Sequence, residues 1–140
     1  MAKRVEITLK SKPRGFHLVT SEVLGALRDK GLALPDVGLC NIFVKHTSCG
    51  LAICENYDRD VRHDMALDFD RIVPENAPYY LHTLEGSDDM PSHTKSVLTG
   101  GSLTIPISHG KLDLGTWQGI YLCEFRDYGG PRKLVITVLD

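Results

Sequence analysis

The chain has 140 residues, of which 42% are hydrophobic and 24% charged, and its formal net charge is −2. This size predicts a single domain, residues 1–140, with a core of its own, and the composition excludes disordered and collagen-like classes. The slightly acidic balance argues against a nucleic-acid partner, which usually requires a basic surface. No apolar run reaches the roughly 18 residues that span a membrane, and no signal-peptide core follows the N-terminus. We therefore expect a cytoplasmic protein.

The first part of the sequence predicts a strand followed by a helix. Apolar and polar residues alternate over Val5–Leu9, as they do in a half-buried strand. Lys12–Gly15 has the composition of a turn. Thr20 or Ser21 can cap a helix whose apolar residues fall near helical spacing, and Gly31 is suited to end it.

The middle of the sequence predicts a hairpin and a second helix. Gly38–His46 and Leu51–Cys54 are rich in β-forming residues and flank the turn-like Ser48–Gly50, so we expect the two strands to pair. A helix is expected from Asp58 to about Arg71, because apolar residues recur there at positions i, i+4 and i+8.

The last part predicts a short helix and then a run of strands. His93–Thr99 lies between Pro91 and Gly100, residues typical of the start and end of a helix. Strand-like segments follow at residues 102–107, 112–114, 115–125 and 133–139. Because strands follow one another directly, we expect antiparallel pairing and an α+β fold, a β-sandwich-like sheet with two or three flanking helices.

The segment His82–Lys95 concentrates polar residues that can carry chemistry. It contains two histidines, His82 and His93, and three carboxylates. Imidazole is the commonest metal ligand and the natural acid or base near neutral pH. The alternative is a solvated loop in which Asp88 and Asp89 cap the next helix.

Three histidines can be combined into a metal site. His46, His82 and His93 would supply three nitrogen ligands, which leaves an open position for water, as in catalytic zinc sites. In an enzyme, Glu85 and Asp88 would join His82 and His93 in catalysis by orienting the imidazoles. A metal-free acid–base site is the competing interpretation.

Other residues are candidates for substrate binding. Glu55 and Asn56 end the strand opposite His46 and could line a pocket, although such residues also make local turn hydrogen bonds. Three cations would suit a phosphate or carboxylate substrate unless they are ordinary solvated charges: Arg14, Lys95 and Arg132. Cys123 lies in an apolar strand where nothing lowers its thiol pKa, so it is not expected to be a nucleophile.

Blocks spread over nearly the whole chain resemble the YjbQ family, which is also described as secondary thiamine-phosphate synthase-like. The matching blocks are Arg14–His17, His46–Ser48, Glu55–Asn56, Val61–Met65, Glu85–His93, Gly115–Tyr121 and Gly129–Arg132. The resemblance implies a β-sandwich-like fold, a homotrimer and a pocket near the subunit boundaries. It also implies weak thiamine-phosphate synthase activity, which joins a pyrimidine diphosphate to a thiazole phosphate with loss of pyrophosphate. Cys49 and Thr94 depart from the alanine and isoleucine usual in the family.

Two functional hypotheses follow from these residues. In the first, the protein is an enzyme that acts on a small phosphorylated or heteroaromatic molecule, with a divalent metal such as zinc or magnesium, or with protons shuttled by the histidines. In the second, the same pocket belongs to a non-catalytic module that binds a metal or a metabolite.

Overall fold

The computed structural model describes residues 1–140 and contains eight strands and three helices. In chain order they are β1 Ala2–Leu9, β2 Gly15–Leu18, α1 Thr20–Asp29, β3 Val37–Val44, β4 Cys49–Glu55, α2 Arg59–Ile72, α3 Asp89–Thr99, β5 Ser102–Ser108, β6 Lys111–Leu112, β7 Gln118–Glu124 and β8 Arg132–Leu139. The expected α+β class is confirmed. None of the helices is both long and apolar enough to cross a membrane.

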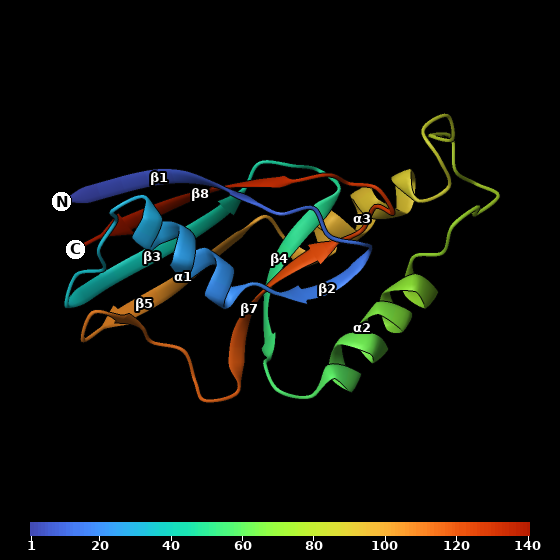
Figure 1. The fold of residues 1–140 in the computed structure, drawn as a ribbon. Coiled ribbons are helices and arrows are strands. Elements are labelled where there is room, and N and C mark those ends of the chain that lie inside the picture. The colour runs from blue at the N-terminus through green and yellow to red at the C-terminus, as the bar shows by residue number, and fades with distance from the viewer.

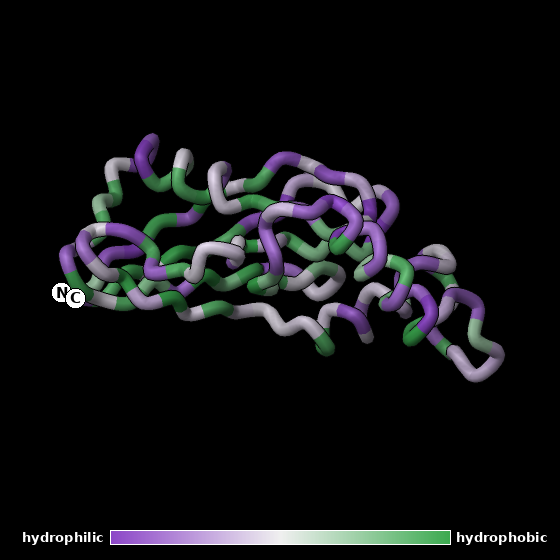
Figure 2. The backbone as a smooth tube through the Cα atoms, turned by 90° about the horizontal axis from the view of Figure 1, so that it is seen from below, coloured by the Kyte–Doolittle hydropathy of each residue, from purple (hydrophilic) through white to green (hydrophobic).

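The strands form two antiparallel sheets (Figure 1). One has the order β1-β8-β3-β5-β6 and the other has the order β2-β7-β4. The first and last strands pair along their whole length, from Ala2 opposite Leu139 to Leu9 opposite Arg132. The two chain ends therefore lie side by side, as Figures 1 and 2 both show.

The expected hairpin between the third and fourth strands is wrong. β3 pairs with β5 and β8, whereas β4 pairs with β7 in the other sheet. Residues 45–48 carry the chain from one sheet to the other. Both strands then bury apolar side chains in one common core, Ile42 and Val44 from β3 and Leu51 from β4. The composition of a strand indicates that it is buried, but it does not show in which of the two sheets the strand pairs.

The hydrophobic core fills the space between the two sheets and α1. Its main cluster has 18 buried residues, including Val23 and Leu27 of α1. Burying a side chain of this size contributes roughly 1.5–3 kcal/mol relative to exposure. A smaller cluster of Tyr121, Cys123 and Phe125 packs against Phe69 of α2. Helix α1 therefore contributes to the main cluster, and α2 covers the smaller one.

The helices α1 and α2 begin where the sequence predicts, whereas α3 begins at Asp89, four residues before the expected start at His93. Asp58 caps α2 through a carboxylate that accepts the N–H of Asp60 at 2.9 Å. Thr20 does not cap α1, because its hydroxyl accepts the N–H of Ile120 at 2.9 Å and so joins the helix to β7. Gly31 follows α1 with a φ of 71°, a left-handed conformation that suits glycine.

The segment between α2 and α3 projects from one end of the molecule (Figures 1 and 2). It carries strongly exposed apolar side chains, among them Leu81 and Leu84. The chain returns to the body at α3, which packs against β4 through the Ser96 hydroxyl, 2.7 Å from the Cys49 carbonyl oxygen. A side chain at Gly50 would overlap Thr99, so glycine permits this close approach. The polar segment is thereby anchored to the second sheet.

Candidate functional site

His82, Asp89 and His93 converge at the start of α3. The Nε2 atoms of His82 and His93 lie 2.5 Å and 3.1 Å from the same oxygen, Asp89 Oδ2. The three ligand atoms all lie within 4.8 Å of one another. The Asp89 side chain is 2% exposed, whereas the imidazoles are 43% and 33% exposed. The site therefore has a buried carboxylate at its base and two histidines within reach of solvent.

The local sequence explains how the three side chains meet. Asp89 and His93 are four residues apart on α3, so their side chains share one face of the helix. Asp89 also lies in the first turn, where the helix dipole favours a negative charge. His82 comes from the segment before the helix and reaches Asp89 from outside.

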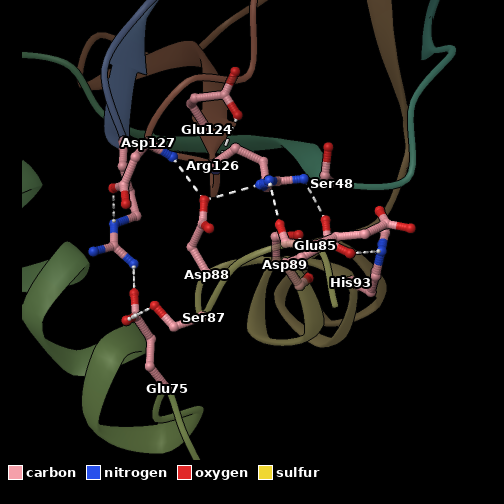
Figure 3. Close-up of polar contacts among 12 residues, drawn as sticks. Ser48, Glu75, Glu85, Ser87, Asp88, Asp89, His93, Glu124, Arg126 and Asp127 are labelled. Carbon is pink, nitrogen blue, oxygen red and sulfur yellow. Dashed lines mark hydrogen bonds and ion pairs between the residues drawn. The ribbon is translucent and has the colours of Figure 1, made fainter. Parts of the chain in front are cut away.

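Arg126, just after β7, holds both aspartates in place (Figure 3). Its Nε donates to Asp88 Oδ2 at 2.9 Å, its Nη1 donates to Asp89 Oδ1, and its Nη2 donates to the Glu85 carbonyl at 3.1 Å. The Asp127 N–H also donates to Asp88 Oδ2, at 3.0 Å. Neither aspartate side chain is used as a helix cap. The capping alternative therefore does not describe these side chains.

These contacts set the charge of the carboxylates. Burial alone would raise the pKa of Asp89, but the contact with His82 and the positive charge that His93 and Arg126 place beside the carboxylate outweigh burial and hold that pKa below its usual range. The pKa of Asp88 is lowered in the same way, because the Asp127 N–H and Arg126 outweigh its burial. Asp89 is consequently an anion at neutral pH.

The contact of His93 Nδ1 with a backbone carbonyl determines which of the two ring nitrogens carries the proton when the ring is neutral. Nδ1 lies 2.8 Å from the Thr47 carbonyl oxygen, which can only accept, so Nδ1 carries the proton. A neutral His93 then points the lone pair of Nε2 at the anionic Asp89 Oδ2, 3.1 Å away. Two acceptors at this distance require a positive group between them. Either His93 is a cation or a metal ion binds both atoms.

The donor set fits zinc better than magnesium. Two imidazole nitrogens and one carboxylate oxygen match the three protein ligands of catalytic zinc sites, whereas magnesium prefers oxygen ligands and retains its waters. Metal-binding histidines usually donate their other N–H to a carbonyl or carboxylate, as His93 does to Thr47. Arg126 similarly fixes the free oxygen of Asp89. Both the ligand atoms and the groups that orient them are present.

The structure does not bring His46 into this group. Its Nε2 accepts the backbone N–H of Lys133 at 2.8 Å, so this lone pair is already used. Burial and the charge of Arg132 lower its pKa, which keeps the ring neutral. Asp89, and not His46, lies with His82 and His93. Its spacing of four residues before His93 would indicate this grouping only in a helix that begins at Asp89, as α3 does, and the sequence predicts a start at His93.

Glu85 and Asp88 were expected to orient the histidines. Of these two carboxylates, only that of Asp88 is linked to Asp89, because Arg126 donates hydrogen bonds to both aspartates. Glu85 contributes its carbonyl oxygen to Arg126, while the residue itself is exposed. The sequence does not predict the contacts of Arg126 with the two aspartates. Arg126 lies 37 residues from Asp89 in the chain, and no local pattern marks it.

The three cations expected to bind substrate are each paired with a carboxylate. Arg132 Nε and Nη2 lie 2.7 Å and 2.5 Å from the two oxygens of Glu124, and both residues are buried. Arg14 contacts Glu75 at 2.6 Å. Lys95 is 2% exposed, and its Nζ lies 2.6 Å from Asp70. None of these side chains is an unpaired cation facing the histidines.

Glu55 and Asn56 lie at the other end of β4 from α3 and make turn hydrogen bonds. The Glu55 carboxylate accepts the Asp58 N–H at 3.2 Å, just before α2. The Asn56 amide donates to the carbonyls of Thr116 and Gln118 at 3.1 Å and 3.0 Å. These contacts match the local alternative that the sequence left open.

A small polar cavity of about 100 Å³ adjoins the histidine site. His82 forms part of its wall, together with Asn76, Tyr80, Ser87 and Met90. Its size allows a few non-hydrogen atoms beside His82. The cavity therefore suits a small polar group and not an extended apolar ligand.

Fold and site together define a small α+β protein with two packed antiparallel sheets and an accessible His–Asp–His group. Residues 5–140 match the family model described as UPF0047 protein YjbQ-like. The chain belongs to this family, as the resemblance indicated. It is 51% identical to the YjbQ protein of Salmonella typhimurium and 48% identical to that of Escherichia coli O157:H7, over 94% of each chain in both cases.

A solved structure supports the same assignment. An uncharacterized conserved protein of the YjbQ/UPF0047 family from Clostridium acetobutylicum matches with a TM-score of 0.82 and 36% identity, covering 96% of this chain and 99% of its own. This protein therefore shares both sequence and fold with the family.

Proposed function

We propose that this protein is a metal-dependent enzyme acting on a small phosphorylated molecule, with zinc held by His82 Nε2, His93 Nε2 and Asp89 Oδ2. The observation that carries the proposal is the pairing at His93. Its Nδ1 proton is committed to the Thr47 carbonyl, while its Nε2 faces the anionic Asp89 at 3.1 Å. A metal ion between these atoms would remove the repulsion and satisfy both, and the zinc titration below distinguishes it from a proton on His93 Nε2.

The residues around the zinc would then have separate roles. Three protein ligands leave a position for water or a phosphate oxygen, and bound zinc lowers the pKa of such a water to about 7. Arg126 holds Asp89 in its orientation, and Thr47 holds His93 in the required tautomer. A substrate's polar end fits the cavity beside His82.

The thiamine-phosphate synthase reaction implied by the resemblance is a more specific candidate for the reaction of this enzyme. Arg14, Lys95 and Arg132 are occupied by carboxylates, so a pyrimidine diphosphate would rely on the metal to neutralise its leaving group. The specific expectation is therefore pyrophosphate release that depends on zinc and on Asp89. A homotrimer with the site near subunit boundaries remains part of this proposal.

Metal binding is tested first. Purified protein would be stripped with chelator, and zinc binding would be measured by calorimetry and elemental analysis. We expect one zinc per chain, lost in the His82→Ala/His93→Ala double variant and strongly weakened in Asp89→Asn, because each change removes a ligand. His63→Ala, an exposed histidine on α2, is the matched control and should bind normally. Equal zinc binding by the double variant would refute the site.

The role of His46 is resolved by the same titration. We expect His46→Ala to retain zinc, because its ring accepts the Lys133 N–H and lies outside the group. Loss of zinc in this variant alone would restore the three-histidine site.

Turnover is tested separately. Zinc-loaded protein would be incubated with a pyrimidine diphosphate and a thiazole phosphate, and pyrophosphate would be quantified. We expect release by the wild type and none by Asp89→Asn. Stoichiometric zinc binding without any product would instead support the non-catalytic binding module. Light scattering on the same samples measures the oligomeric state.

A further inference from the structure

A second, larger cavity lies away from the histidine site. Its volume is about 540 Å³, and it opens between α1, the segment that follows α1, and the β5–β6 turn. Strand β5 runs from the α3 end to this turn, so about 20 Å of strand separates the two regions. Figure 1 shows α3 and the tip of β5 toward opposite ends of the molecule. The volume falls within the usual range of small-molecule sites.

The wall of this cavity is strongly apolar. Six leucines line it: Leu24, Leu27, Leu32, Leu34, Leu112 and Leu114. Two of them, Leu27 and Leu32, are buried core residues, and the other four pack against the core. The cavity floor is thus continuous with the interior of the protein. An apolar ligand bound there would extend the core.

Two cations complete the lining, and no carboxylate does. Arg28 lies in the last turn of α1, where its guanidinium folds back over Gly25. Lys111 is the first residue of β6. Both are exposed, and neither side chain is among those that form ion pairs. They contrast with Arg14, Lys95 and Arg132, whose charges are already balanced by carboxylates.

From this combination we propose that the cavity binds an amphiphile with one anionic headgroup, namely a carboxylate on an apolar chain. The chain packs against the leucines, and the carboxylate lies between Arg28 and Lys111. The positive charges of Arg28 and Lys111 at the rim of the cavity favour an anionic ligand. No carboxylate of the protein lines the cavity, so none competes with the ligand for these two cations. The site is separate from the histidine group and does not depend on the metal.

A chain-length series tests the apolar part. Binding of hexanoate, octanoate and decanoate to the intact protein would be measured by calorimetry below their micelle concentrations. Each added methylene that becomes buried should strengthen binding about fourfold. Saturable binding with this increment supports the proposal. Absence of saturable decanoate binding, or affinity that does not change with chain length, would overturn it.

Charge variants test the anionic part. The Arg28→Gln/Lys111→Gln double variant should bind decanoate about twofold to thirtyfold more weakly, the range for two exposed ion pairs. As a control, Lys30→Gln removes one positive charge at the end of α1 but outside the cavity, so this variant should bind decanoate normally. Equal weakening in this control, or no weakening in the double variant, would refute the role of the rim.

A filling variant separates a small ligand from a protein occupant. Ala33→Trp places a large side chain at the exposed edge of the cavity and should abolish decanoate binding while the urea midpoint stays unchanged. Light scattering of wild type and variant is run in parallel. If Ala33→Trp dissociates an oligomer, a second copy of the chain occupies this cavity and the proposal fails. An unchanged oligomeric state together with loss of binding supports it.

Discussion

Replacing Arg132 with methionine distinguishes a structural role for this residue from the substrate-binding role that the sequence suggested. Arg132 is 3% exposed and Glu124 is fully buried, and their two hydrogen bonds measure 2.7 Å and 2.5 Å. Arg132 Nη2 also donates to the Ser48 hydroxyl at 2.9 Å. Arg132→Met leaves a buried carboxylate without its partner. Breaking such a pair from one side costs about 3–5 kcal/mol.

This cost is a large part of the total stability of a domain of this size, which is about 5–15 kcal/mol. Each kcal/mol lowers the melting temperature by about 2–4 °C, so we expect a decrease of roughly 6–20 °C. Urea unfolding followed by circular dichroism would measure the loss directly. Adding Glu124→Gln should recover much of it, because the second change removes the uncompensated charge.

The controls decide between the two roles. Lys133→Met removes a neighbouring exposed charge and should change stability by less than about 0.5 kcal/mol. Zinc affinity of Arg132→Met should equal that of wild type at temperatures where both are folded, because Arg132 does not contact His82, Asp89 or His93. A variant of normal stability that has lost substrate binding would refute the structural assignment.

Three further predictions test other features of the fold. Burial would raise the pKa of Glu22, but its hydrogen bond with Lys12 outweighs this effect and holds the pKa below 4.5. Glu22→Gln should therefore be about 0.5 kcal/mol less stable than wild type above pH 4.5, and urea titrations at decreasing pH should show this difference vanish as the carboxylate is protonated. A thiol reagent at pH 8 should label only Cys54 before denaturation, because burial raises the pKa of the other three thiols; rapid labelling of two or more would contradict this. Gly50→Ala should lower the free energy of unfolding by about 1–3 kcal/mol, since its methyl group would overlap Thr99, and an unchanged urea midpoint would show that α3 moves freely.

The histidine site illustrates how far local patterns reach. His82 and His93 were identified from the residue types in one segment, and the structure brings their rings to 5.6 Å between centroids. The sequence predicts a helix that begins at His93, with Asp89 before it as a candidate cap, whereas in the structure α3 begins at Asp89 and both side chains share one helix face. Arg126 comes from a distant strand end, and only folding brings it to Asp89.

The candidate substrate-binding residues show the limit of the same reasoning. A cation in a sequence gives no information about its partner, so Arg14 and Lys95 were not distinguishable from free surface charges. Their carboxylates, Glu75 and Asp70, lie 61 and 25 residues away. Pairing over such separations is set by tertiary contacts, not by spacing along the chain.

What the sequence alone determined is the α+β class, the approximate positions of most of the long elements and the location of the histidine segment. Periodicity and capping residues carry this information because they act over a few neighbouring residues. Only the tertiary structure shows that β3 and β4 belong to different sheets, that Asp89 and not His46 lies with His82 and His93, and that Glu124 neutralises Arg132. Each of these features depends on which segments, distant in the sequence, pack against one another. The free energy of that arrangement depends on the whole core and not on a few neighbouring residues.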